Sequence, residues 1–208
     1  MISSSNLSYS FSESVKLSYP DWKVGDGEHG LILGNSGSGK TTFLHLLSGL
    51  LKPTSGSVKL DDTDITLLKS GELDVFRGKH VGLVFQKPHL ISALSVSDNL
   101  RLATFLGRKS DQNARIEELL DSLGLDGLGK RRISEISQGQ AQRVSIARAL
   151  INHPKVVFGD EPTASLDDSS CEKVIDILQQ QADKHGATLI LATHDHRVKS
   201  HFSNQIEL

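Results

Sequence analysis

The sequence predicts an α/β fold built around a parallel sheet, and two observations support this fold class. Four short segments are apolar on successive residues, which is typical of strands that are covered on both faces. They are residues 31–33, 81–85, 156–158 and 189–192. Stretches with helical spacing of apolar residues lie between these segments, and strands that alternate with helices indicate an α/β core.

The first elements beyond this core follow from local patterns. Residues 1–30 and 55–66 carry β-type alternation between turn residues, and we expect them to form a small antiparallel sheet. An apolar helix over residues 42–51 should follow the first buried strand. Residues 95–98 have the pattern of a capping box, which predicts a helix that runs to residue 106.

Two later helices are indicated by the spacing of their apolar residues. Residues 116–123 are apolar at i, i+3, i+4 and i+7, and Gly124 follows as a stop signal. Residues 174–178 belong to another helix, which should end before Gly186.

The chain is expected to form a single domain over residues 1–208. Residues 88–135 show helical patterns without a convincing strand, so we expect them to form a mostly helical subdomain inserted into the core. The α/β core would then comprise residues 1–87 and 136–208, to within a few residues.

Composition narrows the possible functions. The 208 residues carry a formal net charge of −2, whereas nucleic-acid-binding proteins usually show a basic field, so we expect no nucleic-acid partner. No stretch approaches the roughly 20 apolar residues of a membrane helix, so we expect no direct membrane insertion. Cys171 is the single cysteine, which rules out an intramolecular disulfide and favours a reducing, cytoplasmic environment.

Residues 34–41 match the phosphate-loop pattern G-x-x-x-x-G-K-[S/T], between a strand and a helix as the pattern requires. The glycines let the main chain approach a phosphate, and the N–H groups at the helix N-terminus face the anion. Lys40 would neutralise the β- and γ-phosphates, and the hydroxyl of Thr41 would bind Mg²⁺. The alternative, a glycine-rich turn that matches by accident, is disfavoured by the flanking strand and helix. The expected nucleotide-binding residues are Gly34, Asn35, Ser36, Gly37, Ser38, Gly39, Lys40, Thr41 and Thr42.

Two carboxylates, Asp160 and Glu161, follow the buried strand at residues 156–158. Ligands of open α/β sheets bind beyond the carboxyl ends of the strands, so these side chains should lie near the phosphate loop. Asp160 would help to bind Mg²⁺, and Glu161 would act as general base toward the attacking water. Alone, the pair could be a polar turn at the end of a strand. Together with the phosphate loop, it predicts an enzyme of the P-loop NTPase class that uses a nucleoside triphosphate and Mg²⁺.

A third motif resembles one family of these enzymes. Residues 136–140, Ile-Ser-Gln-Gly-Gln, resemble the Leu-Ser-Gly-Gly-Gln signature of ABC ATPases and stand immediately before a helical pattern. Residues 161–167 are similar to the catalytic segment and D-loop of that family. Gln86 resembles its Q-loop glutamine, and His194 its switch histidine. These elements occur in the family's order and span nearly the whole chain.

The resemblance implies the ABC ATPase fold and a head-to-tail homodimer that encloses two ATP molecules. Ser137, Gly139 and Gln140 of one subunit would close on the phosphates held by the other. Gln86 would complete the Mg²⁺ shell with Thr41 and Asp160, and His194 would join Glu161 in catalysis by contacting the γ-phosphate. Phe11 is the candidate for stacking on adenine, with Tyr9 as its rival. The chain departs from the signature at Ile136 and Gln138, which puts the backbone freedom of that turn in doubt.

The resemblance also implies a partner and a location. A separate transmembrane permease would hold the protein at the inner face of the cell membrane. A short helix of the permease would bind in a groove of this chain that is lined by His89, Leu90 and Ile91. Residues 73–86 resemble the branch of lipoprotein-releasing, macrolide-exporting and cell-division ATPases. The expected function is ATP hydrolysis that powers transport, and the alternative is regulation of a membrane partner in cell division. The short interval between Gly39 and Ser137 disfavours a DNA-repair ATPase with a coiled-coil insertion.

Overall fold

The computed structural model describes residues 1–110, 112–163 and 168–208. Its central sheet is parallel, with strand order β10-β4-β9-β8-β7. The four buried strands expected from the sequence are present as β4 (Gly30–Leu33), β7 (Val81–Phe85), β8 (Val156–Asp160) and β9 (Thr188–Thr193). The edge strand β10 (Asn204–Glu207) was not predicted, because its sequence NQIE lacks an apolar run.

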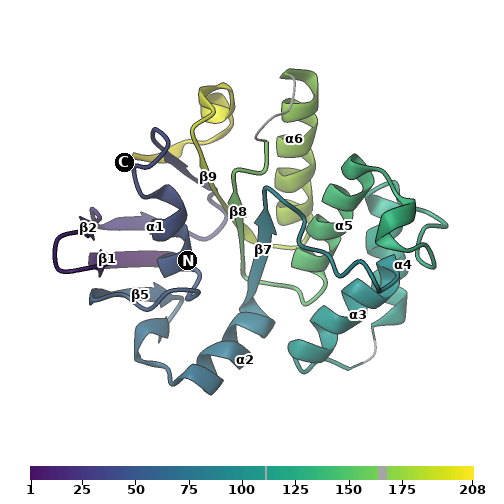
Figure 1. Ribbon diagram of the computed structural model, residues 1–208, viewed down its shortest axis with the longest axis horizontal. Helices are drawn as coiled ribbons and strands as arrows, with labels where there is room; N and C mark the ends of the chain where they lie inside the picture. Colours follow the sequence, from purple (N-terminus) through teal and green to yellow (C-terminus); the bar gives the residue numbers. More distant parts are fainter. Residues whose placement is uncertain (111, 164–167) are drawn as a thin grey trace.

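A second, antiparallel sheet is formed by the two regions that show β-type alternation, as predicted. Its order is β2-β1-β5-β6, and β3 also pairs with β1. The strands are β1 (Ile2–Ser10), β2 (Lys16–Ser18), β3 (Trp22–Val24), β5 (Ser55–Leu60) and β6 (Thr63–Asp64). This sheet lies at one end of the molecule (Figure 1).

Helix α1 (Lys40–Leu47) lies between the two sheets. Its buried residues Phe43, Leu44, Leu46 and Leu47 share one hydrophobic core with Ile2 and Val58 of the antiparallel sheet and with Ile32, Phe158 and Ile190 of the parallel sheet. The helix is shorter than the predicted range 42–51 and ends before Gly49, whose φ of +70° is incompatible with continuing the helix. The core fixes the helix N-terminus, and therefore the phosphate loop before it.

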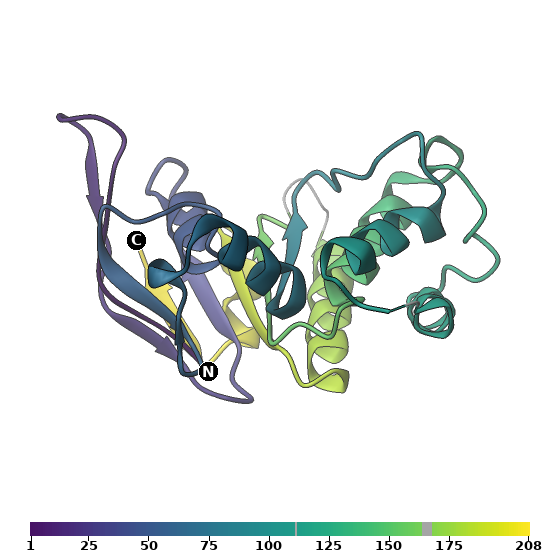
Figure 2. The ribbon, with the colours of Figure 1, turned by 90° about the horizontal axis from the view of Figure 1, so that it is seen from below.

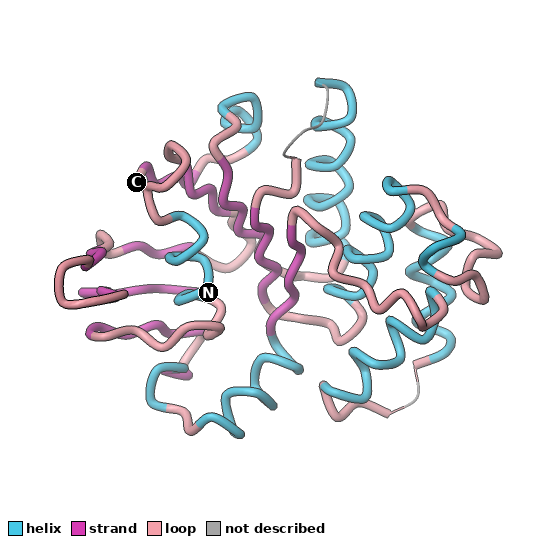
Figure 3. The backbone as a smooth tube through the Cα atoms, viewed as in Figure 1, coloured by secondary structure: helices cyan, strands magenta, loops and turns pink. Residues whose placement is uncertain are grey.

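The other side of the parallel sheet is covered by helices, which Figure 2 shows from a second direction. Helices α5 (Gln138–Leu150) and α6 (Asp168–Lys184) contact the strands, and α3 (Val96–Leu106) and α4 (Asn113–Ser122) pack on α5. Their apolar faces share a second core with Leu31, Val157 and Leu189 of the sheet. Among the described residues between 88 and 135, the tube in Figure 3 shows helices and loops, as predicted for that region. The boundaries of a separate helical subdomain remain a prediction.

Helix α2 (Ser70–His80) leads directly into β7 and was not predicted as a helix. The helix has no fully buried residue, and a helix that buries no face needs no strong apolar stripe in its sequence. Short 3₁₀ turns complete the chain at η1 (Ile65–Leu67), η2 (Ile133–Glu135) and η3 (His196–His201). Within the ranges described, we find no helix that is both long and apolar enough to span a membrane.

Candidate functional site

The phosphate loop connects β4 to α1 and is closed around its own lysine. Nζ of Lys40 donates a hydrogen bond to the main-chain oxygen of Asn35 at 2.9 Å, and the Lys40 side chain is only 6% exposed. Gly39 has a φ of +99°, and a Cβ at this position would lie 3.0 Å from the hydroxyl of Tyr19. That hydroxyl donates to the carbonyl of Gly39 at 3.1 Å. The tight turn holds a buried ammonium group at the N-terminus of α1, where an anion is favoured by both charge and helix dipole.

The predicted Mg²⁺ ligands Asp160 and Thr41 are in contact. Asp160 is the last residue of β8, and its Oδ1 accepts a hydrogen bond from the hydroxyl of Thr41 at 3.1 Å. Burial raises the pKa of Asp160 above its ordinary value, and the Thr41 hydrogen bond opposes that shift only in part. A partly buried carboxylate beside a hydroxyl offers two oxygen ligands to a divalent cation, and the positive charge of such a cation would favour the ionised form of the carboxylate.

Glu161 is held by three groups in a strained backbone conformation. Its φ is +49°, in the left-handed region that costs a non-glycine residue about 1–3 kcal/mol. One carboxylate oxygen accepts from the hydroxyl of Thr193 at 2.8 Å, and the other lies 3.6 Å from Nζ of Lys40. Nδ1 of His194 is 3.0 Å from both carboxylate oxygens. These contacts hold the carboxylate between the lysine and the histidine of the predicted site.

These residues surround one open pocket of about 580 Å³, within the size range of small-molecule sites. Its lining combines the loop, the strand ends and the antiparallel sheet. The lining residues are Phe11, Leu17, Ser36, Gly37, Gly39, Lys40, Thr41, Thr42, Gln86, Glu161 and His194. Of the predicted loop residues, Gly34, Asn35 and Ser38 are not part of this lining, although Asn35 bonds the lysine from behind.

The two aromatic candidates differ in what they offer a nucleotide base. Phe11 is 58% exposed and lines the pocket, together with Leu17. Tyr9 is partly buried against the core between the sheets and contacts Phe11 edge-on, with ring centroids 4.9 Å apart. Only Phe11 has an aromatic surface at the pocket, so the geometry favours it over Tyr9. Leu17 is an apolar neighbour that the sequence did not single out.

Three predicted nucleotide-binding residues lie elsewhere, at the N-terminus of α5. Ser137 and Gln140 form a capping box, in which Ser137 Oγ accepts from the Gln140 N–H at 3.2 Å and Gln140 Oε1 accepts from the Ser137 N–H at 2.8 Å. A Cβ added to Gly139 would meet nothing within 4 Å, so the chain's own packing does not require glycine there. None of the three lines the pocket. Gln138, which differs from the glycine of the family signature, is the first residue of the helix, and its side chain is exposed. Residues 164–167 of the predicted D-loop lie outside the described residues.

Thr193 is a site residue that the sequence reasoning missed. It is 1% exposed at the end of β9, and besides its bond to Glu161 its hydroxyl accepts from the Asp195 N–H at 3.0 Å. The signal in the sequence is a hydroxyl residue at the end of an apolar strand, directly before His194. Its position links the two predicted catalytic residues through one buried hydroxyl group.

Comparison with known proteins agrees with this arrangement. The model of the ABC transporter family matches residues 17–164. The lipoprotein-releasing system ATP-binding protein LolD of Syntrophotalea carbinolica is 39% identical over 95% of this chain and 90% of its own length. The macrolide export ATP-binding/permease protein MacB of Mannheimia succiniciproducens is 43% identical over 88% of this chain but only 28% of its own. Both belong to the branch that residues 73–86 resemble.

Solved structures of ABC cassettes share the fold. The ATP-binding cassette MJ0796, a dimer in a post-hydrolysis state with ADP and Pi bound, superposes with a TM-score of 0.88 at 31% identity, covering 100% of this chain and 94% of that one. The cbiO1 protein of Clostridium perfringens, part of an ABC transporter complex, superposes with a TM-score of 0.87 at 30% identity, covering 99% and 83%. The P-loop fold, the pocket and these matches agree, and the chain belongs to the ABC transporter family as an ATP-binding, ATP-hydrolysing domain.

Proposed function

We propose that this protein hydrolyses ATP to drive a separate membrane permease, and that two copies close head-to-tail on the nucleotide. One observation carries the proposal. The pocket contains the phosphate loop, Gln86, Glu161 and His194, whereas the signature residues Ser137 and Gly139 form an exposed helix tip away from it. A second copy could bring its helix tip to the open pocket, where main-chain N–H groups and the helix dipole would face the γ-phosphate. The dimeric state of the cassette MJ0796 supports this assembly.

Within the pocket, the chain's own residues divide the chemistry. Lys40 neutralises charge on the phosphates, and the open face of Phe11 receives the base. Glu161, fixed by Thr193, accepts a proton from the attacking water, and His194 contacts the γ-phosphate. Catalysis of this kind consists mainly of positioning and charge stabilisation.

The donor set fits Mg²⁺ in its chemistry, because Thr41 and Gln86 line the pocket with a hydroxyl and an amide, and Asp160 offers a carboxylate in contact with Thr41. When bound, the ion would neutralise charge on the β- and γ-phosphates.

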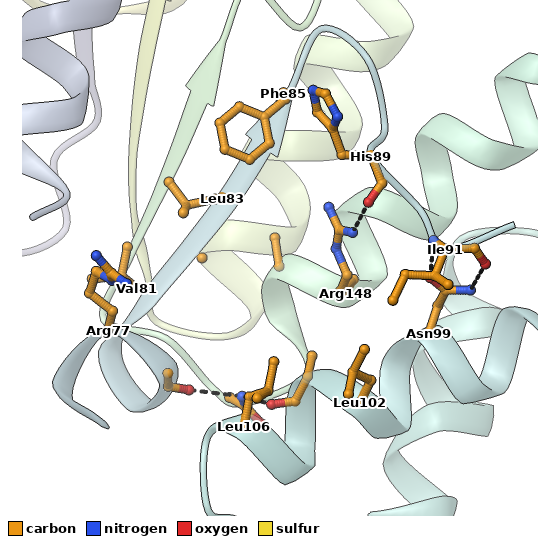
Figure 4. Close-up of a pocket in the computed structure, with 15 residues that line it drawn as sticks. Arg77, Val81, Leu83, Phe85, His89, Ile91, Asn99, Leu102, Leu106 and Arg148 are labelled. Atoms are coloured by element: carbon orange, nitrogen blue, oxygen red, sulfur yellow. Dashed lines mark hydrogen bonds between the residues drawn. The ribbon is translucent and has the colours of Figure 1, made fainter. Parts of the chain in front are cut away.

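The permease would dock in a second pocket of about 420 Å³ (Figure 4). It lies between the segment after β7 and helices α3 and α5, and an apolar part of its lining comes from Ile91, Leu102 and Leu106. His89 and Ile91 line this pocket, whereas Leu90 is not part of its lining and packs, partly buried, against the hydrophobic core. Such a partner would hold the protein at the inner face of the membrane. Regulation of a membrane partner in cell division would use the same surface.

The Glu161→Gln variant tests the assignment. It keeps the size of the side chain but removes the base, so we expect it to bind ATP normally and to hydrolyse it at least about 100-fold more slowly. Glu172→Gln, at an exposed position of α6, is the matched control. Measurement of phosphate release together with nucleotide titration separates chemistry from binding. Wild-type turnover in Glu161→Gln would refute the assignment of the base.

A further inference from the structure

The short segment after β7 connects the two pockets. Gln86 lines the nucleotide pocket, and three residues later His89 lines the groove between β7 and the helices. Any change at the groove therefore reaches Gln86 through three peptide units. What holds this segment in place determines where the Gln86 side chain lies.

Arg148, in the last turns of α5, holds the segment by its main chain. Its Nη1 donates to the carbonyl of His89 at 2.7 Å, and its Nη2 donates to the carbonyl of Pro88 at 2.9 Å. Figure 4 shows that the guanidinium group of Arg148 on α5 contacts the loop segment that follows β7. Two donors of one planar group thus fix two consecutive peptide units, which a flexible single-donor side chain could not do.

The Arg148 contact combines a partly buried charge with a strained stretch of main chain. Burial lowers the pKa of the Arg148 guanidinium, which means that the surroundings penalise its charge. Its hydrogen bonds to the carbonyls of Pro88 and His89 oppose that penalty, and both carbonyls would lose this donor if the side chain were apolar. The contact also supports His89 in a left-handed conformation, with φ of +46°, which is unfavourable for a non-glycine residue. A charged residue and a strained backbone are therefore maintained together at the point where the segment turns into the groove.

Other contacts hold the chain immediately before Gln86, at Phe85. Nε2 of Gln142, also on α5, donates to the carbonyl of Phe85 at 3.4 Å. The ring of Phe85 meets the ring of His89 edge-on, with centroids 5.5 Å apart. Helix α5 thus grips the chain on both sides of Gln86, while its own N-terminus carries Ser137.

We propose that Arg148 is a positioning residue, which sets the place of Gln86 in the nucleotide pocket by clamping the carbonyls of Pro88 and His89. The inference rests on the proposed function of Gln86 as a Mg²⁺ ligand. It makes α5 a rigid connection between the groove, the Gln86 segment and the signature tip. Loss of an outer contact that orients a metal ligand typically costs about 10–100-fold in metal affinity.

The experiment measures binding of the fluorescent analogue MANT-AMP-PNP with and without Mg²⁺, which needs no turnover. The dissociation constant without Mg²⁺ divided by that with Mg²⁺ gives the Mg²⁺-dependent part of the affinity. Arg148→Met removes both hydrogen bonds, and Arg148→Lys keeps the charge but not the planar fork. Arg143→Met is the matched control, because Arg143 lies on the same helix and donates to the carbonyls of Leu123 and Gly124, away from Gln86.

We expect the ratio to fall about tenfold in Arg148→Met, to fall less in Arg148→Lys and to stay within twofold in Arg143→Met. Hydrogen exchange of the apo protein should accelerate at residues 86–91 in the Arg148 variants alone. An unchanged ratio in Arg148→Met, or in Arg148→Lys if the Met variant does not fold, overturns the proposal. So does an equal fall in Arg143→Met. A wild-type protein that binds no nucleotide contradicts the proposed function instead.

Discussion

The proposed nucleotide pocket and the tip of α5 would each receive an anion, but they differ in how far contacts within one chain engage their polar groups. In the pocket, Lys40 and Glu161 are each engaged by other residues of the same chain. At the helix tip, Ser137 and Gln140 satisfy only each other, and Gly139 faces open space. We infer that the pocket is prepared within one chain, whereas the tip would act only when another molecule brings a phosphate to it.

The largest expected effect is on the prepared side. Lys40→Ala removes the buried ammonium from the phosphate loop, and we expect ATP affinity to fall at least about 100-fold because a charge-assisted contact to phosphate is lost. Isothermal titration with ATP measures the change. Lys52→Ala, at an exposed position after α1, should bind as wild type does. Unchanged affinity in Lys40→Ala would remove the basis for calling this pocket the nucleotide site.

A smaller effect should separate positioning from binding within the pocket. Thr193→Val replaces the hydroxyl that fixes Glu161, so we expect kcat to fall about tenfold while ATP affinity stays within twofold. Steady-state phosphate release and nucleotide titration give the two quantities. Thr188→Val, at the other buried end of β9, controls for the loss of a hydroxyl in the same strand. A variant with wild-type kcat would mean that Glu161 does not depend on this bond.

The smallest effect concerns the rim of the pocket. Phe11→Ala removes an exposed ring that we expect to stack on the base, which should weaken ATP binding by about tenfold or less. Tyr9→Ala should have a weaker effect, because its ring reaches the pocket only through Phe11. Competition titrations of ATP against inorganic triphosphate distinguish loss of base contacts from loss of phosphate contacts. A larger loss in Tyr9→Ala would transfer the stacking role to Tyr9.

Much of the fold could be predicted because its signals are local. The runs at β4, β7, β8 and β9 are apolar because helices or the second sheet cover both faces of the parallel sheet, and turn residues mark the small antiparallel sheet. The polar edge strand β10 could not be found in this way, because it is defined by its pairing with β4. Helix α2 escaped notice for a related reason, since it buries no complete apolar face.

Site residues could be predicted where they lie close together in a sequence motif. They could not be predicted where the role of a residue depends on a tertiary contact. The phosphate loop and the Asp160–Glu161 pair are continuous patterns. Thr193 and Arg148 act through contacts with Glu161 and with the Gln86 segment, and no spacing rule connects 161 with 193 or 89 with 148. Leu90 illustrates the same limit, because the apolar character of a residue beside a groove does not show that it packs, partly buried, against the core.

The most direct test of a site shared between two copies changes Ser137 in the Glu161→Gln variant, which we expect to bind ATP without hydrolysing it. We expect Glu161→Gln with ATP to give twice the mass of one chain in light scattering. The double variant Glu161→Gln/Ser137→Arg should still bind ATP, because its pocket is intact, but should give the mass of a single chain. A double variant that still doubles its mass with ATP, or that no longer binds ATP at all, would contradict a pocket and a helix tip that meet only between two copies.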